Sequence, residues 1–376
     1  MDFAFNEEQE LLRNSVARFL ADHYDFETFK EVSRGEPGWR RDCWKQFAEL
    51  GLLGASLPEA YGGLGGGPVE TMIMMEAFGR ALVVEPYVPT VVVGGGFLRA
   101  GGSEAQKQNW LARIAQGDAI LAFAFAEPQG RYNLADLATV AKKQGTAYVL
   151  NGRKSVAIGG PFADALIVTA RTAGGRREEK GVSVFLVDRR ARGVATRDYP
   201  TADGLRASEV MFENVEVPTD AVIGTPDDGL SLVEQVTDEA IAAHCAEALG
   251  AMRVLHESTV EYSKTRKQFG LPIGKFQVLQ HRMVDMFMQV EQTASMTLMV
   301  TLKLGEPARA RKKAASAAKV QIGRSGRFVG QNAVQIHGGM GMTDELALGH
   351  YFKRVTLIDT LYGNVDHHLK RYASLS

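Results

Sequence analysis

The hydrophobic pattern of this chain changes twice along its length, and that order limits the folds it can adopt. Residues 1–120 and 227–376 carry apolar side chains at helical spacing. Between them lie short strand-like runs separated by Gly, Pro and charged clusters, at 147–158, 164–171, 181–188 and 207–218. The segments that separate these runs are too short for βαβ units, which argues against a Rossmann sheet.

We therefore expect a mostly helical α+β protein of three domains. The pattern predicts an N-terminal helical domain over residues 1–120, a small β-sandwich or barrel over 121–226 and a C-terminal helical bundle over 227–376. Asn6 followed by Gln9 predicts a capped first helix. The glycine-rich segment 58–68 interrupts the helices, and it is no P-loop because no Gly-Lys-Ser/Thr follows.

Composition narrows the classes of function. A net charge of -1 gives no basic excess for nucleic acid, and no apolar run reaches the ~20 residues that span a bilayer. Cys43 and Cys245 lie far apart among apolar neighbours, which predicts buried thiols and a cytoplasmic protein. The acidic N-terminus does not resemble an export signal. No zinc spacing is present, since the adjacent His367 and His368 diverge on a helix.

Two segments of the last third carry most of the chemistry. RKQFGLPIGKFQ at 266–277 and QIHGGMG at 335–341 place cationic or amide side chains beside aromatic residues, proline or glycine. On spacing alone, one explanation is that Arg266 closes a helix and the glycines turn the chain. The alternative, that both segments bind a ligand, is equally good at this stage.

Further motifs decide between these explanations. PEAYGGLG at 58–65, AEP at 126–128, NGRK at 151–154 and FENVEVP at 212–218 precede the two segments in that order. Together they resemble the acyl-CoA dehydrogenase family across essentially the whole chain. Within that family, the chain is most similar to small subunits of heteromeric enzymes described as pimeloyl-CoA dehydrogenase. The resemblance implies an N-terminal helical domain, a central β domain and a C-terminal four-helix bundle.

The resemblance also implies FAD as cofactor and acyl-CoA as substrate, oxidised to trans-2-enoyl-CoA. In the family, one subunit's bundle receives the adenine half of a flavin held mainly by a neighbour. A forked guanidinium suits a diphosphate, aromatic rings suit the adenosine, and glycines let backbone N–H groups approach an anion. The implied contact residues are Arg266, Gln268, Phe269, Phe276, Gln277, Gln335, Ile336, Gly338, Gly339 and Gly341.

The chain departs from the family where the β domain grips the flavin ring. Ala126 replaces the threonine of the usual Thr-Glu-Pro run, and residues 130–132 replace the start of Gly-Ser-Asp. Residues 155–158 read Ser-Val-Ala-Ile, so the ring-stacking tryptophan that normally follows Asn-Gly-x-Lys is missing. We expect this β domain to lack most partners of a flavin ring.

The family's catalytic base is also missing. Tyr362 stands at the usual glutamate position and Ala240 at the alternative one. A phenol, with a reference pKa of ~10, is a poor base near neutral pH. Asp359, Glu239 and Glu247 are the nearby carboxylates. Each is explained better as a solvated or ion-paired surface group, so Asp359 and Glu239 remain only weak candidates for the base.

These observations lead to one hypothesis with two alternatives. The resemblance implies a subunit that lends its adenine-side surface to a homologous large subunit in a heterotetramer, without a base of its own. The first alternative is a self-sufficient homotetramer with Asp359 or Glu239 as base. The second is a non-catalytic acyl-CoA-binding or scaffold protein. The family resemblance further implies that electrons pass to an electron-transfer flavoprotein.

Overall fold

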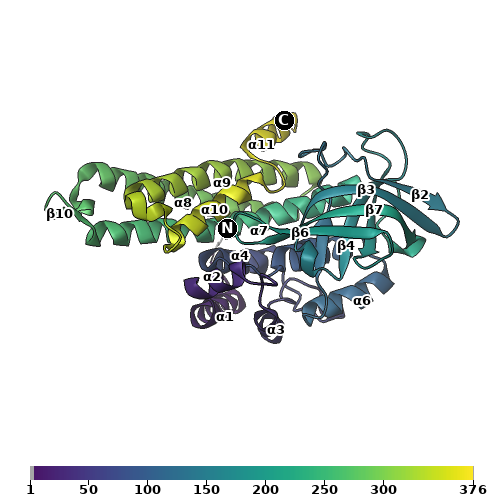
Figure 1. The fold of residues 1–376 in the computed structure, drawn as a ribbon, viewed down its shortest axis with the longest axis horizontal. Coiled ribbons are helices and arrows are strands. Elements are labelled where there is room, and N and C mark those ends of the chain that lie inside the picture. The colour runs from purple at the N-terminus through teal and green to yellow at the C-terminus, as the bar shows by residue number, and fades with distance from the viewer. Residues whose placement is uncertain (1–3, 376) are drawn as a thin grey trace. The chain divides into compact units, whose positions relative to one another are not determined.

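The computed structural model describes residues 4–375, and its elements follow the predicted helix, strand, helix order (Figure 1). The residues form two compact units. The first comprises Met1–Glu31, Pro68–Val83 and Ile241–Ser376, and the second comprises Val32–Gly67 and Val84–Ala240. The domain boundaries at 120 and 226 stay a prediction.

The first unit is a helical bundle in which α9 packs against α8, α10 and α11 (Figure 1). A π-helix and short 3-10 helices connect some of the elements along the chain. The helices that lie in this unit or enter it are α1 (Glu7–His23), α2 (Phe26–Arg34), α4 (Pro68–Ala81), α7 (Leu230–Thr265), α8 (Gln277–Lys303), α9 (Ala308–His337), α10 (Ala347–Thr360) and α11 (Val365–Ser374).

Local sequence explains how these helices begin and how closely they pack. The predicted capping box is confirmed, because Asn6 Oδ1 accepts from the Gln9 amide at 2.8 Å and Gln9 Oε1 accepts from the Asn6 amide at 3.1 Å. Glycines bring α4 and α7 together. A Cβ on Gly79 would lie 1.9 Å from the Glu247 carbonyl oxygen, and one on Gly250 would lie 2.0 Å from that of Glu76.

The second unit is built around a sheet with the strand order β6-β7-β3-β2-β4-β5-β8, in which β1 pairs with β4. All four predicted strands are present as β3, β4, β5 and β7, whereas β1, β2, β6 and β8 were not predicted. The bounds are β1 (Leu121–Ala124), β2 (Val140–Gln144), β3 (Ala147–Ile158), β4 (Ala165–Arg171), β5 (Val182–Asp188), β6 (Val194–Pro200), β7 (Arg206–Pro218) and β8 (Val222–Ile223), with helices α3 (Arg41–Glu49), α5 (Gly95–Gly101) and α6 (Glu104–Ala115).

Apolar side chains from six of these strands form the core of the β domain. Leu150, Val168 and Val210 are fully buried, and the ring of Tyr148 meets the edge of Phe185 at 5.1 Å between centroids. Two of the missed strands, β2 and β6, have a physical explanation. β6 alternates half-buried and exposed positions, and β2 ends in three exposed residues, so neither has the apolar run that marks a buried strand.

Candidate functional site

The segment 266–277 folds as a hairpin between α7 and α8, at one end of the bundle (Figure 1). β9 (Lys267–Gln268) pairs with β10 (Leu271–Pro272), and Gln268 lies opposite Leu271. The two loop residues, Phe269 and Gly270, both have positive φ, at 54° and 82°. A non-glycine residue in this conformation is strained, and such strain concentrates at functional sites.

The hairpin presents cationic and aromatic groups outward. The Phe269 side chain is 92% exposed, and its ring lies edge-on to Phe276 at 6.2 Å. Arg266 and Gln277 are exposed. Within residues 4–375, no hydrogen bond or ion pair engages the Arg266 guanidinium, whereas Gln268 Nε2 donates to the Lys267 carbonyl at 2.8 Å. Arg266 therefore does not cap a helix end with its side chain.

The second predicted segment ends α9 and forms a short 3-10 helix, Gly338–Met342. A Cβ placed on Gly338 or Gly339 would meet no atom within 4 Å, so their backbone lies open. Gln335 is exposed, whereas Ile336 is buried. Gly341 is buried against the end of α9, where a Cβ would lie 3.0 Å from the Val334 carbonyl oxygen, so packing explains this glycine.

An aromatic contact brings the two predicted segments together. The ring of Tyr262, in the last turn of α7, stacks on His337 at 4.2 Å, and its hydroxyl donates to the His337 carbonyl at 3.4 Å. The hairpin begins a few residues after Tyr262, and the open glycines follow His337. This end of the bundle thus combines a free guanidinium, an exposed aromatic ring and accessible backbone, which fit a diphosphate attached to an aromatic base.

In the β domain, two of the motifs meet in a buried ion pair. Lys154 of NGRK has no exposed surface, and its Nζ contacts Glu127 Oε1 of AEP at 2.7 Å and Thr169 Oγ1 at 3.2 Å. Burial lowers the pKa of Lys154 to about 8, although Glu127 opposes this shift. Glu127 also accepts from the Ala138 and Thr139 amides. These motifs therefore hold the loop after β1 in place.

The positions at which the resemblance implies contacts to a flavin ring lie beside this pair. The Ser155 amide donates to the Ala126 carbonyl at 2.8 Å, and Val156 bridges to Ala126. Val156 is 37% exposed, and Ile158 ends β3 two residues later. The side chains at 126, 156 and 158 contain neither a hydroxyl nor an aromatic ring, so they do not fit the hydrogen-bonding edge of a flavin ring.

Tyr362, at the family's base position, lies in the tight turn between α10 and α11. Its φ is 55°, and the turn is held by buried side chains. Lys319 Nζ donates to the carbonyls of Ile358, Asp359 and Gly363 at 2.8, 2.9 and 2.7 Å, and His368 Nε2 donates to the Tyr362 carbonyl at 3.1 Å. Burial raises the pKa of Tyr362, so the phenol stays protonated near neutral pH.

A buried polar cluster that we did not predict lies beside Tyr362. The His244 ring faces the Tyr362 ring at 6.0 Å, and His244 Nδ1 donates to Glu247 Oε2 at 2.8 Å. Arg354 donates to both oxygens of Glu247, at 2.6 and 2.8 Å. Burial raises the pKa of Glu247, but Arg354 and His244 outweigh it and lower that pKa to about 2. Burial lowers the pKa of His244.

This cluster corrects the sequence-based view of Glu247 as a solvated or surface group, because it is buried and doubly paired. The spacing of His244 and Glu247, three residues apart on a helix, was the available signal. Arg354 lies on another helix, α10, so no local pattern connects it to them. The charge of Glu247 is already neutralised, which leaves it poorly suited to take a proton.

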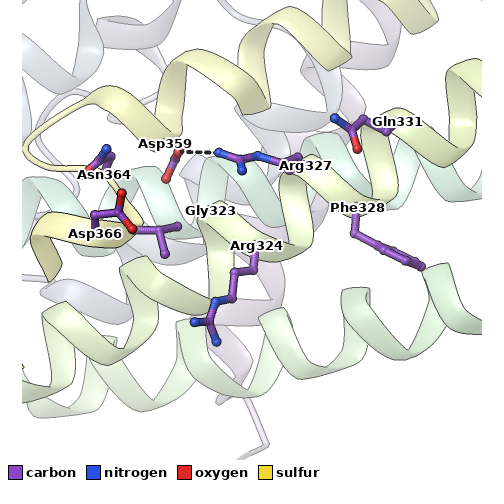
Figure 2. Close-up of a pocket in the computed structure, with 9 residues that line it drawn as sticks. Gly323, Arg324, Arg327, Phe328, Gln331, Asp359, Asn364 and Asp366 are labelled. Atoms are coloured by element: carbon purple, nitrogen blue, oxygen red, sulfur yellow. Dashed lines mark ion pairs between the residues drawn. The ribbon is translucent and has the colours of Figure 1, made fainter. Parts of the chain in front are cut away.

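Both predicted carboxylates lie beside arginines. Asp359 lines a surface pocket of about 360 Å³ formed by α9, the end of α10 and the start of α11 (Figure 2). One of its oxygens lies 3.7 Å from Arg327 of α9, the pair that Figure 2 marks. Glu239, in the second unit, forms an ion pair with Arg99 at 2.7 Å. Ala240, at the alternative base position, is buried and has no titratable group.

Comparison with known proteins agrees with this geometry. Family models for the acyl-CoA dehydrogenase N-terminal, middle and C-terminal domains match residues 6–118, 122–215 and 227–374. A 3-(aryl)acrylate reductase of Clostridium sporogenes is 30% identical over 370 residues, 96% of each chain. The mitochondrial isovaleryl-CoA dehydrogenase of Pongo abelii is 29% identical, covering 94% of this chain and 85% of its own.

The solved structures extend the likeness to the fold. A chain of the ChsE4-ChsE5 complex from Mycobacterium tuberculosis superposes with a TM-score of 0.90 at 26% identity, covering 100% of this chain and 98% of its own. This chain belongs to the acyl-CoA dehydrogenase family. It is an oxidoreductase of that family, with FAD as the cofactor.

The described residues offer neither a membrane-spanning helix nor a group of metal ligands. Between residues 4 and 375, no helix combines the length and the apolar character needed to cross a membrane. In the same part of the chain, His, Cys, Asp and Glu side chains form no group of three or more placed to hold a metal ion. Cys43 and Cys245 are free and buried thiols.

Proposed function

We propose that this chain is one subunit of a heteromeric FAD-dependent acyl-CoA dehydrogenase, and that it supplies the adenine-side surface for a flavin whose ring a homologous partner holds. The observation that carries this proposal is a contrast between the helical bundle and the β domain of this chain. The bundle keeps Arg266, Phe269 and the open backbone at 338–339, whereas the β domain has Ala126 and Val156 at ring-binding positions. Such a chain completes a flavin site better than it builds one.

The residues of this chain would have defined roles in the complex. Arg266 would pair with the diphosphate, Phe269 and Phe276 would pack against the adenosine, and Gln277 and Gln335 would donate or accept at its polar edge. FAD, when bound, accepts the β-hydrogen of the acyl thioester as hydride. The α-proton requires a base, and we propose that the partner provides it, since Tyr362 and Ala240 occupy both family positions here.

The alternatives receive less support. A self-sufficient homotetramer would require Asp359 or Glu239 to act as base, and each carboxylate already forms an ion pair with an arginine of its own unit. A non-catalytic scaffold would have no use for an Arg266 that has no side-chain partner among residues 4–375 and lies beside an outward Phe269. We propose a cytoplasmic location from the reduced cysteines, and an electron-transfer flavoprotein as acceptor from the family resemblance.

The test is to co-express the chain with any homologous acyl-CoA dehydrogenase subunit that a neighbouring gene encodes, and to count flavin per chain after purification. We expect a complex with one flavin for each pair of unlike chains, and dehydrogenation only when both are present. The chain alone should lose roughly 10²–10⁴-fold in rate, because a positioned base contributes about that factor. Full flavin loading and full turnover by the chain alone would contradict the proposal.

A further inference from the structure

A tyrosine of β6 reaches across the sheet to the segment that lacks the family's tryptophan. Tyr199 of β6 pairs with Ala207 of β7, and Ala207 pairs with Ile158 of β3. Directly opposed residues of antiparallel strands point to the same face, so Tyr199 and Ile158 share one face of the sheet. The Tyr199 hydroxyl donates to the Ser155 carbonyl at 2.9 Å. The side chain therefore spans from β6 over β7 to β3.

The packing beneath the ring agrees with this path. Ala207, in the middle strand, has no exposed surface, and its small side chain leaves room for a ring above it. Tyr199 itself is half-buried, and burial raises the pKa of its phenol. Ser155, which accepts the hydroxyl, also donates its amide to Ala126. Tyr199 is thus anchored at the irregular stretch of β3 that joins positions 126 and 156.

We propose that Tyr199 covers the face of the β domain against which the family holds its flavin ring, and that it closes this face in the present chain. The inference rests on the proposed function and adds a second reason why this β domain would not hold a flavin ring. The changes at 126, 156 and 158 remove attractive contacts, whereas Tyr199 adds an obstacle. Restoring the contacts alone should therefore not restore ring binding.

The experiment separates the two causes with riboflavin, which has the ring but neither diphosphate nor adenosine and so cannot use the surface around Arg266. A restored variant combines Ala126→Thr, Val156→Trp and Ile158→Thr, and a second variant adds Tyr199→Ala. Riboflavin affinity is measured on the purified chain by equilibrium dialysis and fluorescence quenching. We expect the first variant to bind no better than the parent chain, and the second to bind at least about tenfold more tightly, as one aromatic contact permits.

Two further variants keep the result interpretable. Tyr372→Ala, which removes an exposed tyrosine of α11, should change nothing in either background. Tyr199→Phe keeps a ring but loses the hydrogen bond to Ser155, so in the restored background it should increase riboflavin affinity less than Tyr199→Ala does. It replaces Tyr199→Ala in the experiment if that variant does not fold. The inference would be overturned if the restored variant bound riboflavin as tightly with Tyr199 in place as after Tyr199→Ala. Weaker binding after Tyr199→Ala would also overturn it. The assay uses no partner subunit, so failure to form a heteromer would leave its outcome readable.

Discussion

His244 donates from Nδ1 to Glu247 Oε2 across 2.8 Å, and both side chains are almost completely buried in the bundle. Arg354 binds the same carboxylate with two hydrogen bonds. The cluster places a neutral imidazole and a neutralised carboxylate beside Tyr362, the position at which the family resemblance implies a glutamate base. If a partner subunit supplies the base, as proposed above, the space around Tyr362 is available to groups that stabilise the fold.

Removal of the Glu247 charge should destabilise the protein strongly. Glu247→Gln leaves Arg354 buried without its partner, and breaking a buried pair in this way costs about 3–5 kcal/mol. Denaturant unfolding gives the free energy. The matched control is Glu257→Gln, which breaks the exposed pair with Arg80 on the same bundle and should cost at most about 1 kcal/mol. Equal losses in the two variants would show that burial does not determine the strength of the Glu247 pair.

The same carboxylate should make stability depend on pH in the acid range. The pKa of Glu247 is about 2 in the folded protein against 4.5 as its ordinary value. Its contribution is therefore complete above pH 4.5 and is lost as the pH falls toward 2. The free energy of unfolding of the parent chain should fall by about 3 kcal/mol more than that of Glu247→Gln over this range, measured by urea titration at each pH. If the free energy of unfolding depended on pH in the same way for both proteins, the lowered pKa of Glu247 would be refuted.

Lys319 should hold the Tyr362 turn in place. Lys319→Met removes an ammonium that satisfies three buried carbonyls, and hydrogen bonds to charged groups contribute roughly 1.5–3 kcal/mol each. We expect a loss of several kcal/mol and faster amide hydrogen exchange confined to residues 358–366. Lys353→Met, on the exposed side of α10, is the control and should change stability by less than about 0.5 kcal/mol. Unchanged exchange in the turn would exclude this role.

Arg266 should matter for flavin retention and not for stability. Its side chain is exposed and has no partner in the part of the chain that the structure describes, so Arg266→Ala should leave the melting temperature unchanged. In the heteromeric complex the same change should lower FAD affinity about tenfold or more, since a charge-assisted contact to the diphosphate is lost. Arg282→Ala, an exposed arginine of α8, serves as the control. Equal flavin content in both variants would argue against a diphosphate contact.

Neither Asp359 nor Glu239 should act as the base. Asp359→Asn and Glu239→Gln should each keep kcat of the complex within about threefold, because loss of a positioned base would cost roughly 10²–10⁴-fold. Acyl-CoA substrates of several chain lengths should be assayed, so that an effect on binding is separated from one on chemistry. A hundredfold fall in kcat for either variant would favour the self-sufficient alternative.

Sequence alone determined the order of the elements and the family. Apolar periodicity revealed the helices, and β-branched runs revealed β3, β4, β5 and β7, because both patterns arise from local burial. The motifs also pointed to the segments 266–277 and 335–341, which the structure brings to the same end of the bundle through Tyr262 and His337. The sequence also shows where the chain departs from the pattern that the resemblance implies, such as Ala126 in place of a threonine, because such a comparison needs no coordinates.

Only the tertiary structure decided which groups compensate for those losses. Arg354 meets Glu247 from another helix, Lys319 reaches the turn at 363 across 44 positions of sequence, and Tyr199 lies 44 residues from the carbonyl that anchors it. Such contacts depend on helix packing and strand register. The physical reason is that local spacing encodes which face of an element is buried, whereas the partner of a buried polar group is set by the neighbour that folding brings against it.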